Sequence, residues 1–302
     1  YEQSSIAANV ASQIAGDSSN AKTSVKLRSR FSFTAVEDTA SPWRQFLVLL
    51  RRNSLNNIRN PGIFWVRCVM YVALGTMIGT MYLYTNKSIT DEDIAVLLFG
   101  AHAFFVFMSV AVVPLFIEER GVFLRERANS SLSILSFTAA NFLAAVPGIF
   151  LIALVVSCIV VFLVGLKCFS YYLLNLFLSM LVAESMMRVI GASCSHGIIG
   201  LIIGASIFGV FMLCEGFMVP KHAIPDYWIW GYYLGFHTYA FETFMHKQFM
   251  PEAAGSPVPA ILTRMGLTEV QSDRNMGILL GYALALEVIF AVIIYFVHTG
   301  RR

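Results

Sequence analysis

The sequence predicts an all-α membrane protein with six transmembrane helices, an amphipathic connecting helix before them, and a re-entrant helical segment before the last span. Hydrophobic residues make up 57% of the chain, charged residues only 13%, and the mean hydropathy is +0.70. Six apolar runs have about 20 residues or more, the length that a helix needs to cross a ~30 Å hydrocarbon core. They lie at roughly 63–84, 94–117, 138–165, 169–189, 198–217 and 277–298. Since lipid offers backbone groups no hydrogen bonds, these runs are predicted to be helices.

Residues 1–40 are rich in Ser, Ala, Asn and Thr, which predicts a polar linker or tail. The chain begins with Tyr1, so we expect a fragment or a processed piece, and no signal-peptide h-region precedes the first span. The net charge of +3 is small, and no basic run is interleaved with aromatic residues. This pattern argues against a nucleic-acid partner.

Residues 41–60 are predicted to form the connecting helix. Its apolar residues fall at i, i+3, i+4 and i+7, on one helical face: Trp43, Phe46, Leu47 and Leu50. Three Arg side chains lie off that face, as in a helix at a membrane interface. A helix packed on another soluble domain gives the same pattern, and the two interpretations are compatible.

Charge placement predicts the orientation. An even number of spans puts both ends of the six-helix domain, residues 61–302, on one side. That side carries fourteen Lys and Arg residues and the other carries six, so both termini are expected in the cytosol. We expect a multi-pass protein of the plasma membrane. Residues 218–275 are then the outer region, and Asn86, followed by Lys87 and Ser88, is a candidate glycosylation acceptor.

A short charged segment, Glu118–Arg127, follows the second span. Val122 and Phe123 lie among its charges, which a solvated loop does not require. Two interpretations stay open from the residues alone. One is a docking loop whose apolar knob inserts into a partner; the other is an interfacial turn whose long side chains reach toward the membrane surface.

The segment after the fifth span holds prolines and an aromatic cluster, including Trp228, Trp230 and Tyr233. Trp and Tyr favour the headgroup level of a bilayer, and two prolines stop a continuous helix. An apolar helical stretch follows at about 234–249. These features predict a short re-entrant helix pair in the outer leaflet.

Five ionisable residues lie in or near the spans, where such residues are functional candidates. They are His102, Glu184, Arg188, Glu215 and Glu287. Glu184 and Arg188 are one helical turn apart and are expected to pair with each other. Glu215 is placed to cap the re-entrant segment. For His102 and Glu287, a proton relay and simple interhelical hydrogen bonds both stay open.

Catalytic and metal-binding patterns are not evident. His237, Glu242 and His246 share the re-entrant stretch without HExxH spacing, and the five cysteines are scattered. The sequence has no GxxxxGK[ST] loop and no Rossmann glycine cluster. We therefore expect no metal site, no catalytic residue and no cofactor in this chain, so that uphill transport needs an ion gradient or a partner domain.

Three stretches together resemble the transmembrane domain of ABC transporters of the G family, over residues 42–298. The first runs from Arg51-Arg52-Asn53 to Arg59-Asn60-Pro61, and the second from Glu119 to Asn129, similar to the family's ER-x-VF-x-RE coupling loop. The third joins Gly216-Phe217-Met218-Val219 to Ile224-Pro225-x-x-Trp228-x-Trp230-x-x-Tyr233.

The resemblance implies a dimer, homomeric or heteromeric, with the second and fifth helices of both copies around a central cavity. It implies a nucleotide-binding domain outside this sequence that uses ATP and Mg²⁺. The implied coupling loop includes Glu119, Arg120, Phe123, Arg125 and Glu126. The implied cavity residues are Phe104, Phe107, Ala205, Gly209 and Met212. Phe217 and Met218 stand where some members have a paired-leucine plug.

An apolar wall with few converging polar groups favours a lipophilic cargo, such as a sterol, a lipid or a hydrophobic drug. The leading hypothesis is the membrane half of an ATP-driven exporter, surrounded by membrane lipids. A gradient-driven carrier or channel would show converging intramembrane charges and inverted repeats. A non-transporting membrane scaffold would have a filled, dry dimer seam.

Overall fold

The computed structural model describes residues 41–60, 64–83, 90–129, 132–250 and 257–297. Apart from Ser41 they belong to the unit formed by Pro42–Arg302. The polar segment predicted at 1–40 and the candidate acceptor Asn86 lie outside the described residues.

All regular secondary structure in the described ranges is helical, as the predicted fold class requires. The α-helices are α2 (Pro42–Arg59), α3 (Val66–Met81), α4 (Asp91–Phe107), α5 (Val112–Asn129), α6 (Ile134–Val164), α7 (Phe169–Ser193), α8 (Gly197–Cys214), α9 (Ile229–Leu234), α10 (Phe236–Phe249), α11 (Ala260–Met265) and α12 (Ser272–Val297). Two 3-10 turns are η2 (Met108–Ala111) and η3 (Lys221–Ala223).

Five helical stretches in the described ranges are long and apolar enough to cross a membrane. They are Asp91–Arg127, Ile134–Val164, Phe169–Ser193, Gly197–Cys214 and Ser272–Val297. The first predicted run forms α3, which is apolar but has 16 residues. At 1.5 Å per residue it covers about 24 Å, slightly less than a hydrocarbon core. An all-α membrane protein is confirmed, with five spans that meet the length and a shorter sixth helix.

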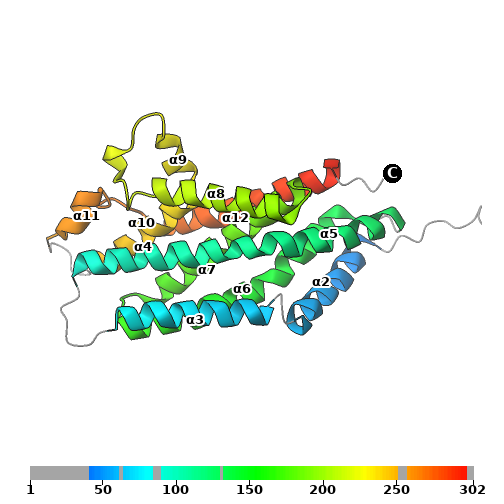
Figure 1. Ribbon diagram of the computed structural model, residues 1–302, viewed down its shortest axis with the longest axis horizontal. Coiled ribbons are helices and arrows are strands. Elements are labelled where there is room, and N and C mark those ends of the chain that lie inside the picture. Colours follow the sequence, from blue (N-terminus) through cyan, green and yellow to red (C-terminus); the bar gives the residue numbers. More distant parts are fainter. Residues whose placement is uncertain (1–40, 61–63, 84–89, 130–131, 251–256, 298–302) are drawn as a thin grey trace, which may run out of the picture. The chain divides into compact units, whose positions relative to one another are not determined.

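The long helices run between two opposite ends of the bundle (Figure 1). Figure 1 shows α2, the end of α5 and the end of α12 toward one end, and α9, α11 and the start of α4 toward the other. Hydrogen bonds agree, because Arg127 donates to the Ile294 carbonyl at 2.9 Å and the Ser136 hydroxyl donates to the Pro42 carbonyl at 2.8 Å. We call these the α2 end and the α9 end. The first and last described helices therefore share the α2 end.

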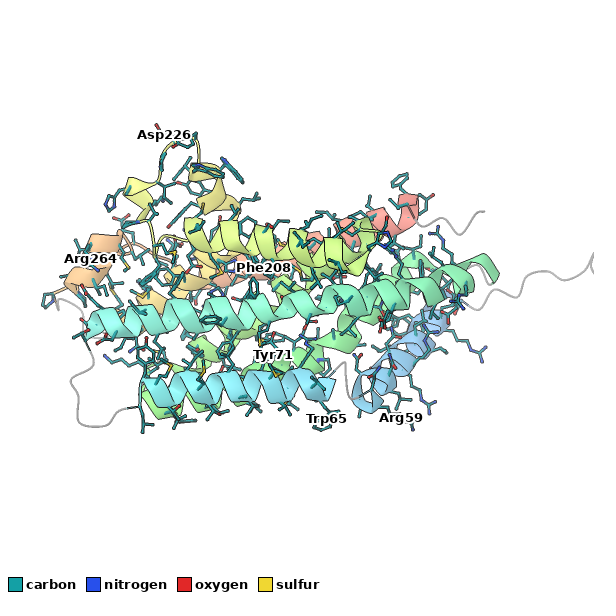
Figure 2. The ribbon with its side chains drawn as sticks, in the orientation of Figure 1. Arg59, Trp65, Tyr71, Phe208, Asp226 and Arg264 are labelled. Carbon is teal, nitrogen blue, oxygen red and sulfur yellow. The ribbon has the colours of Figure 1, made fainter. Side chains whose placement is uncertain are left out.

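Helix α7 forms much of the interior. It is buried along most of its length and contacts α12, α6, α5 and α10. Its polar residues explain this position, because a polar side chain in lipid needs a partner. Asn175 donates to the Ala240 carbonyl at 2.8 Å, and Ser179 donates to the Asn175 carbonyl at 2.7 Å. Figure 2 shows the surrounding side chains, with Tyr71 on α3 and Phe208 on α8.

Short helices occupy the α9 end. Helix α10 is largely buried against α4, α7 and α12, whereas α9 carries exposed aromatic residues. The Tyr232 hydroxyl donates to Glu242 at 2.5 Å, and Asn275 donates to the same carboxylate at 2.8 Å. Burial and the Glu242 carboxylate raise the pKa of the Tyr232 hydroxyl. His246 lies instead beside Ser272, at 3.3 Å. Of the three residues considered for a metal site, Glu242 and His246 therefore bond to different partners.

Small residues let helices approach closely inside one chain. A Cβ added at Gly200 would lie 2.6 Å from Val113 Cγ1, and one added at Gly79 would lie 2.7 Å from Leu163 Cδ1. These glycines belong to two GxxxG pairs, Gly75 with Gly79 and Gly200 with Gly204, and such pairs allow close helix contact within a chain or between chains. At Gly79 and Gly200 the close contact is with a neighbouring helix of the same chain.

Replacing Gly200 by Ala is expected to destabilise the protein by about 1–3 kcal/mol, because the new methyl group overpacks the contact with the β-branched Val113. Thermal unfolding in detergent measures the effect. Gly209→Ala is the matched control, since a Cβ at Gly209 meets no atom within 4 Å. Equal unfolding temperatures for wild type and Gly200→Ala would contradict this packing.

Candidate functional site

The charged segment after the second span is helical. Helix α5 continues through Asn129, so the expectation of a loop or turn at Glu118–Arg127 is wrong. Pro114 does not break α5, because it lies in the first turn, where a missing N–H costs little, and η2 precedes it. Beyond Pro114 the segment holds no further proline, and its apolar residues recur at helical spacing.

Phe123 lies inside the chain rather than on its surface. Its ring is about 1% exposed and lies 4.1 Å from the ring of Phe137, centroid to centroid. Phe116, seven residues earlier and on the same helical face, contacts Phe290 at 5.2 Å. Leu49 of α2 belongs to the same buried cluster. Phe123 therefore joins α5 to α2, α6 and α12, and it is not a knob presented to a partner.

Two arginines of α5 anchor its end to neighbouring helices. Arg120 donates to the carbonyls of Gly191 and Cys194 at 3.0 and 2.6 Å, which satisfies the C-terminal end of α7. Arg127 donates to Ile294 of α12, as described above. The face of α5 that carries Arg120 and Arg127 therefore contacts α7 and α12 of the same chain.

The opposite face of α5 is exposed. Glu118, Val122 and Arg125 fall at i, i+4 and i+7 and are all exposed. Glu119 is exposed beside them. The sequence predicted that Val122 and Phe123 would both form an apolar contact for a partner. In the structure Val122 is exposed and Phe123 is buried.

An ion pair links this helix to the connecting helix. Arg52 of α2 and Glu126 of α5 are 2.5 Å apart, with 45% and 31% of their side-chain surface exposed. Farther along α2, Asn53 donates to Asn141 of α6, and Asn57 donates to the Ala144 carbonyl at 3.1 Å. Helix α2, present where residues 41–60 predicted it, is therefore fixed to both α5 and α6.

Intramembrane charges pair between helices. Arg67 of α3 pairs with Glu184, and Arg188 pairs with Glu287 of α12 at 2.8 Å. The expected Glu184–Arg188 pair is wrong, because each side chain meets an opposite charge on a neighbouring helix. Sequence reasoning gave Arg67 no role, although an Arg inside an apolar run was a signal for one.

The proton relay considered between His102 and Glu287 gains no support. Glu287 pairs with Arg188, whereas the His102 ring lies 5.3 Å from His237 and 5.6 Å from Phe244, centroid to centroid. Glu215 is fully buried, directly after α8. Its carboxylate makes no hydrogen bond within the described residues, so the expected cap of the re-entrant segment is not seen there.

The predicted cavity residues lie on α4 and α8, which contact each other. Phe104 and Phe107 leave 57% and 42% of their surface exposed. Ala205, Gly209 and Met212 are partly exposed along α8. No charged residue occurs in α8, and in α4 the charges are confined to the first turn.

The predicted gate residues have different environments. Gly216 has φ of 100°, a left-handed conformation that glycine adopts readily and that turns the chain after α8. Phe217 then packs inside the chain, with its ring stacked on Phe99 at 4.5 Å and edge-on to Phe241 at 5.6 Å. Met218 is exposed. Phe217 is partly buried and Met218 is the more exposed of the two.

Comparisons with known proteins agree with this architecture. A family model described as ABC-2 type transporter matches residues 44–249. The chain is 31% identical over 295 residues to ABC transporter G family member 11 of Arabidopsis thaliana, covering 91% of this chain and 41% of that protein. It is 30% identical over 262 residues to ABC transporter G family member 1 of Petunia hybrida, covering 83% and 41%. The chain thus spans about two fifths of the length of these relatives.

Proposed function

This chain belongs to the ABC-2 type transporter family and is the transmembrane domain of an ABC transporter of the G family, and on that premise we propose that it is the membrane half of an ATP-driven exporter of lipophilic molecules. Two such halves, identical or different, would pair so that α4 and α8 of each enclose a cavity. ATP and Mg²⁺ would bind a nucleotide-binding domain outside this sequence. The expected setting is the plasma membrane, with both termini cytosolic.

The observation that carries the proposal is the exposed aromatic surface of α4. Phe104 and Phe107 stay exposed in a single chain, so they are free to line a cavity between two copies. On α8, Gly209 leaves open space, because a Cβ added there would meet no atom within 4 Å. A cavity bounded by such residues would hold an apolar cargo, whereas a sugar or ion would leave its polar groups unpaired.

The intramembrane charges support a lipophilic cargo as well. Both buried arginines are matched by carboxylates within the chain. They sit on α3, α7 and α12 and not on the two helices proposed to line the cavity. A gradient-driven carrier would be expected to direct such groups toward the transport path.

The α2 end is the proposed contact for the nucleotide-binding domain. On the exposed face of α5, Glu118, Val122 and Arg125 would contact that domain. The buried face packs against α2, α6 and α12, so a movement of α5 would also move these helices. A rigid helix with one face on a partner and the other in the core can transmit a two-state change. Glu126 and Arg52 would keep α2 and α5 moving together.

The test is transport of a lipophilic dye by the full-length protein in inside-out vesicles with ATP. The double variant Phe104→Ala/Phe107→Ala is expected to lower the rate by about tenfold or more, because each truncation removes an aromatic contact worth more than ~1 kcal/mol. Phe162→Ala is the matched control, an exposed Phe on α6. Transport that needs an ion gradient instead of ATP would indicate a carrier. An unchanged rate in the double variant would remove the cavity assignment, and no transport in any variant would favour a scaffold.

A further inference from the structure

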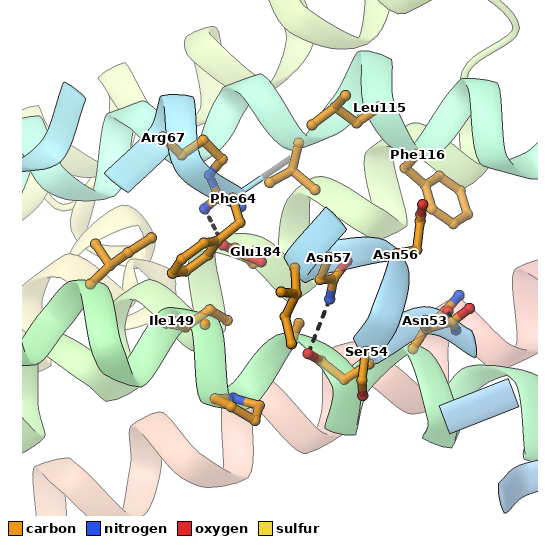
Figure 3. Close-up of a pocket in the computed structure, with 18 of the residues that line it drawn as sticks. Asn53, Ser54, Asn56, Asn57, Phe64, Arg67, Leu115, Phe116, Ile149 and Glu184 are labelled. Atoms are coloured by element: carbon orange, nitrogen blue, oxygen red, sulfur yellow. Dashed lines mark hydrogen bonds and ion pairs between the residues drawn. The ribbon is translucent and has the colours of Figure 1, made fainter. Parts of the chain in front are cut away.

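A second cavity lies within one chain, apart from the α4–α8 surface. It has a volume of about 470 Å³ and is bounded by α2, α3, α5, α6 and α7 (Figure 3). This volume falls in the range typical of small-molecule sites, roughly 300–1,000 Å³. None of the cavity residues predicted from the sequence contributes to it.

Most of the wall is apolar. Phe64 comes from α3's N-terminal side, Leu115 and Phe116 from α5, and Ile149 and Ile152 from α6. Figure 3 shows these helices around the space, with Phe64 opposite the α5 residues. An alkyl chain or ring system would bury its surface here, at roughly 25 cal/mol for each Å² removed from water.

One side of the cavity is polar but uncharged, and α2 supplies it. Asn53 and Asn57 already bond to α6. Ser54 and Asn56 also line the cavity, and their side chains make no hydrogen bond within the described part of the chain. A hydroxyl and an amide are thus available to a ligand as donors and acceptors.

The charged groups that line the cavity are not arranged to bind a charged ligand. Arg67 is paired with Glu184, and Arg188 is paired with Glu287, so neither guanidinium offers an uncompensated charge. Glu119 also lines the cavity and would repel an anionic head group. A cation would meet only Glu119, which is exposed to solvent and therefore attracts it weakly, and it would lie near Arg67 and Arg188.

We propose that this cavity binds an uncharged amphiphile, with its apolar body between α3, α5 and α6 and a hydroxyl head group on the polar side formed by α2, at Asn56. The site is separate from the proposed transport cavity, and it does not depend on ATP or on the identity of the cargo. An occupant would contact the connecting helix and three spans at once. It would therefore stiffen the joint between α2 and the rest of the bundle.

The experiment uses a photoreactive, clickable hexadecanol with the full-length protein in nanodiscs, without nucleotide. Crosslinks are mapped to peptides by mass spectrometry. We expect labelling of α2 and α6 that excess unlabelled hexadecanol suppresses. Photoreactive hexadecanoic acid is the head-group comparison, and it should label these peptides at least about tenfold less, corresponding to ~1.4 kcal/mol.

Three variants test where the probe binds. Ala145→Phe places a large ring in the cavity and should abolish the saturable labelling, whereas Ala139→Phe, at an exposed position on the same helix, should not. Asn56→Leu, at an exposed α2 position that is not expected to affect folding, should remove the preference for the alcohol over the acid. Thermal unfolding checks that each variant is folded.

Labelling that is equal in folded Ala145→Phe and wild type would overturn the site. Preferential labelling by the acid, or an alcohol preference that survives Asn56→Leu, would overturn the assigned head group. Failure of dye transport leaves this labelling result unaffected, so the two proposals fail separately.

Discussion

Replacing Glu184 by Ala is expected to lower the free energy of unfolding by about 3–5 kcal/mol, because it leaves the Arg67 guanidinium buried without its counter-charge. Both side chains are largely buried, so solvent screens the pair little. The loss should appear as a lower unfolding temperature in detergent and as less folded protein in the membrane. Loss of Glu287, the partner of Arg188, should act in the same direction.

The double variant Arg67→Met/Glu184→Met separates the charge from the packing. With both charges replaced by apolar groups of similar length, much of the lost stability should return. A Glu184→Ala protein as stable as wild type would contradict the pairing. A double variant no more stable than Glu184→Ala would show that Arg67 is not the group left uncompensated.

Replacing Phe123 by Ala is expected to cost about 3–5 kcal/mol, the range for removing a buried aromatic ring from a packed cluster. The ring contacts Phe137 and closes the cluster that joins α5 to α2, α6 and α12. Because this cluster supports the proposed coupling helix, the variant should also weaken stimulation of ATP hydrolysis by cargo. Thermal unfolding and ATPase assays of the full-length protein measure the two effects.

Val122→Ala is the matched control for Phe123→Ala. Val122 is the adjacent residue but is 51% exposed, so its truncation should change stability by less than about 0.5 kcal/mol. If Val122 contacts the nucleotide-binding domain, its loss should affect coupling alone. Equal stability losses for both variants would show that the burial pattern of α5 is wrong.

Much of the fold could be predicted from the sequence because length and hydropathy decide where a helix can cross a membrane. The amphipathic pattern of Trp43 to Leu50 likewise placed α2 correctly. The end of α5 could not be predicted in this way, because its charges suggested a solvated or docking segment. The signal for a helix was the seven-residue spacing of Phe116 and Phe123. The sequence does not show which residues pack against these two rings, because Phe290 and Phe137 lie on other helices.

The intramembrane pairs illustrate the same limit. Spacing along one helix favoured Glu184 with Arg188, but sequence separation alone says nothing about which helix packs alongside. Arg67, more than one hundred residues away in sequence, occupies the position that decides the pairing. The second cavity was likewise hidden, because its lining comes from five helices and its polar side from the connecting helix.

Coupling of transport to ATP is tested by the ATPase activity of the full-length protein in lipid, with Glu126→Ala compared to wild type. Glu92→Ala is the matched control, since Glu92 forms another exposed ion pair, with Arg264 at 2.8 Å, at the α9 end. Exposed pairs add about 0–1 kcal/mol to stability, so neither change should unfold the protein. We predict that lipophilic compounds stimulate hydrolysis in wild type and Glu92→Ala, and that Glu126→Ala loses this stimulation. Absent hydrolysis, or stimulation unchanged in Glu126→Ala, would contradict an ATP-driven exporter coupled through α2 and α5.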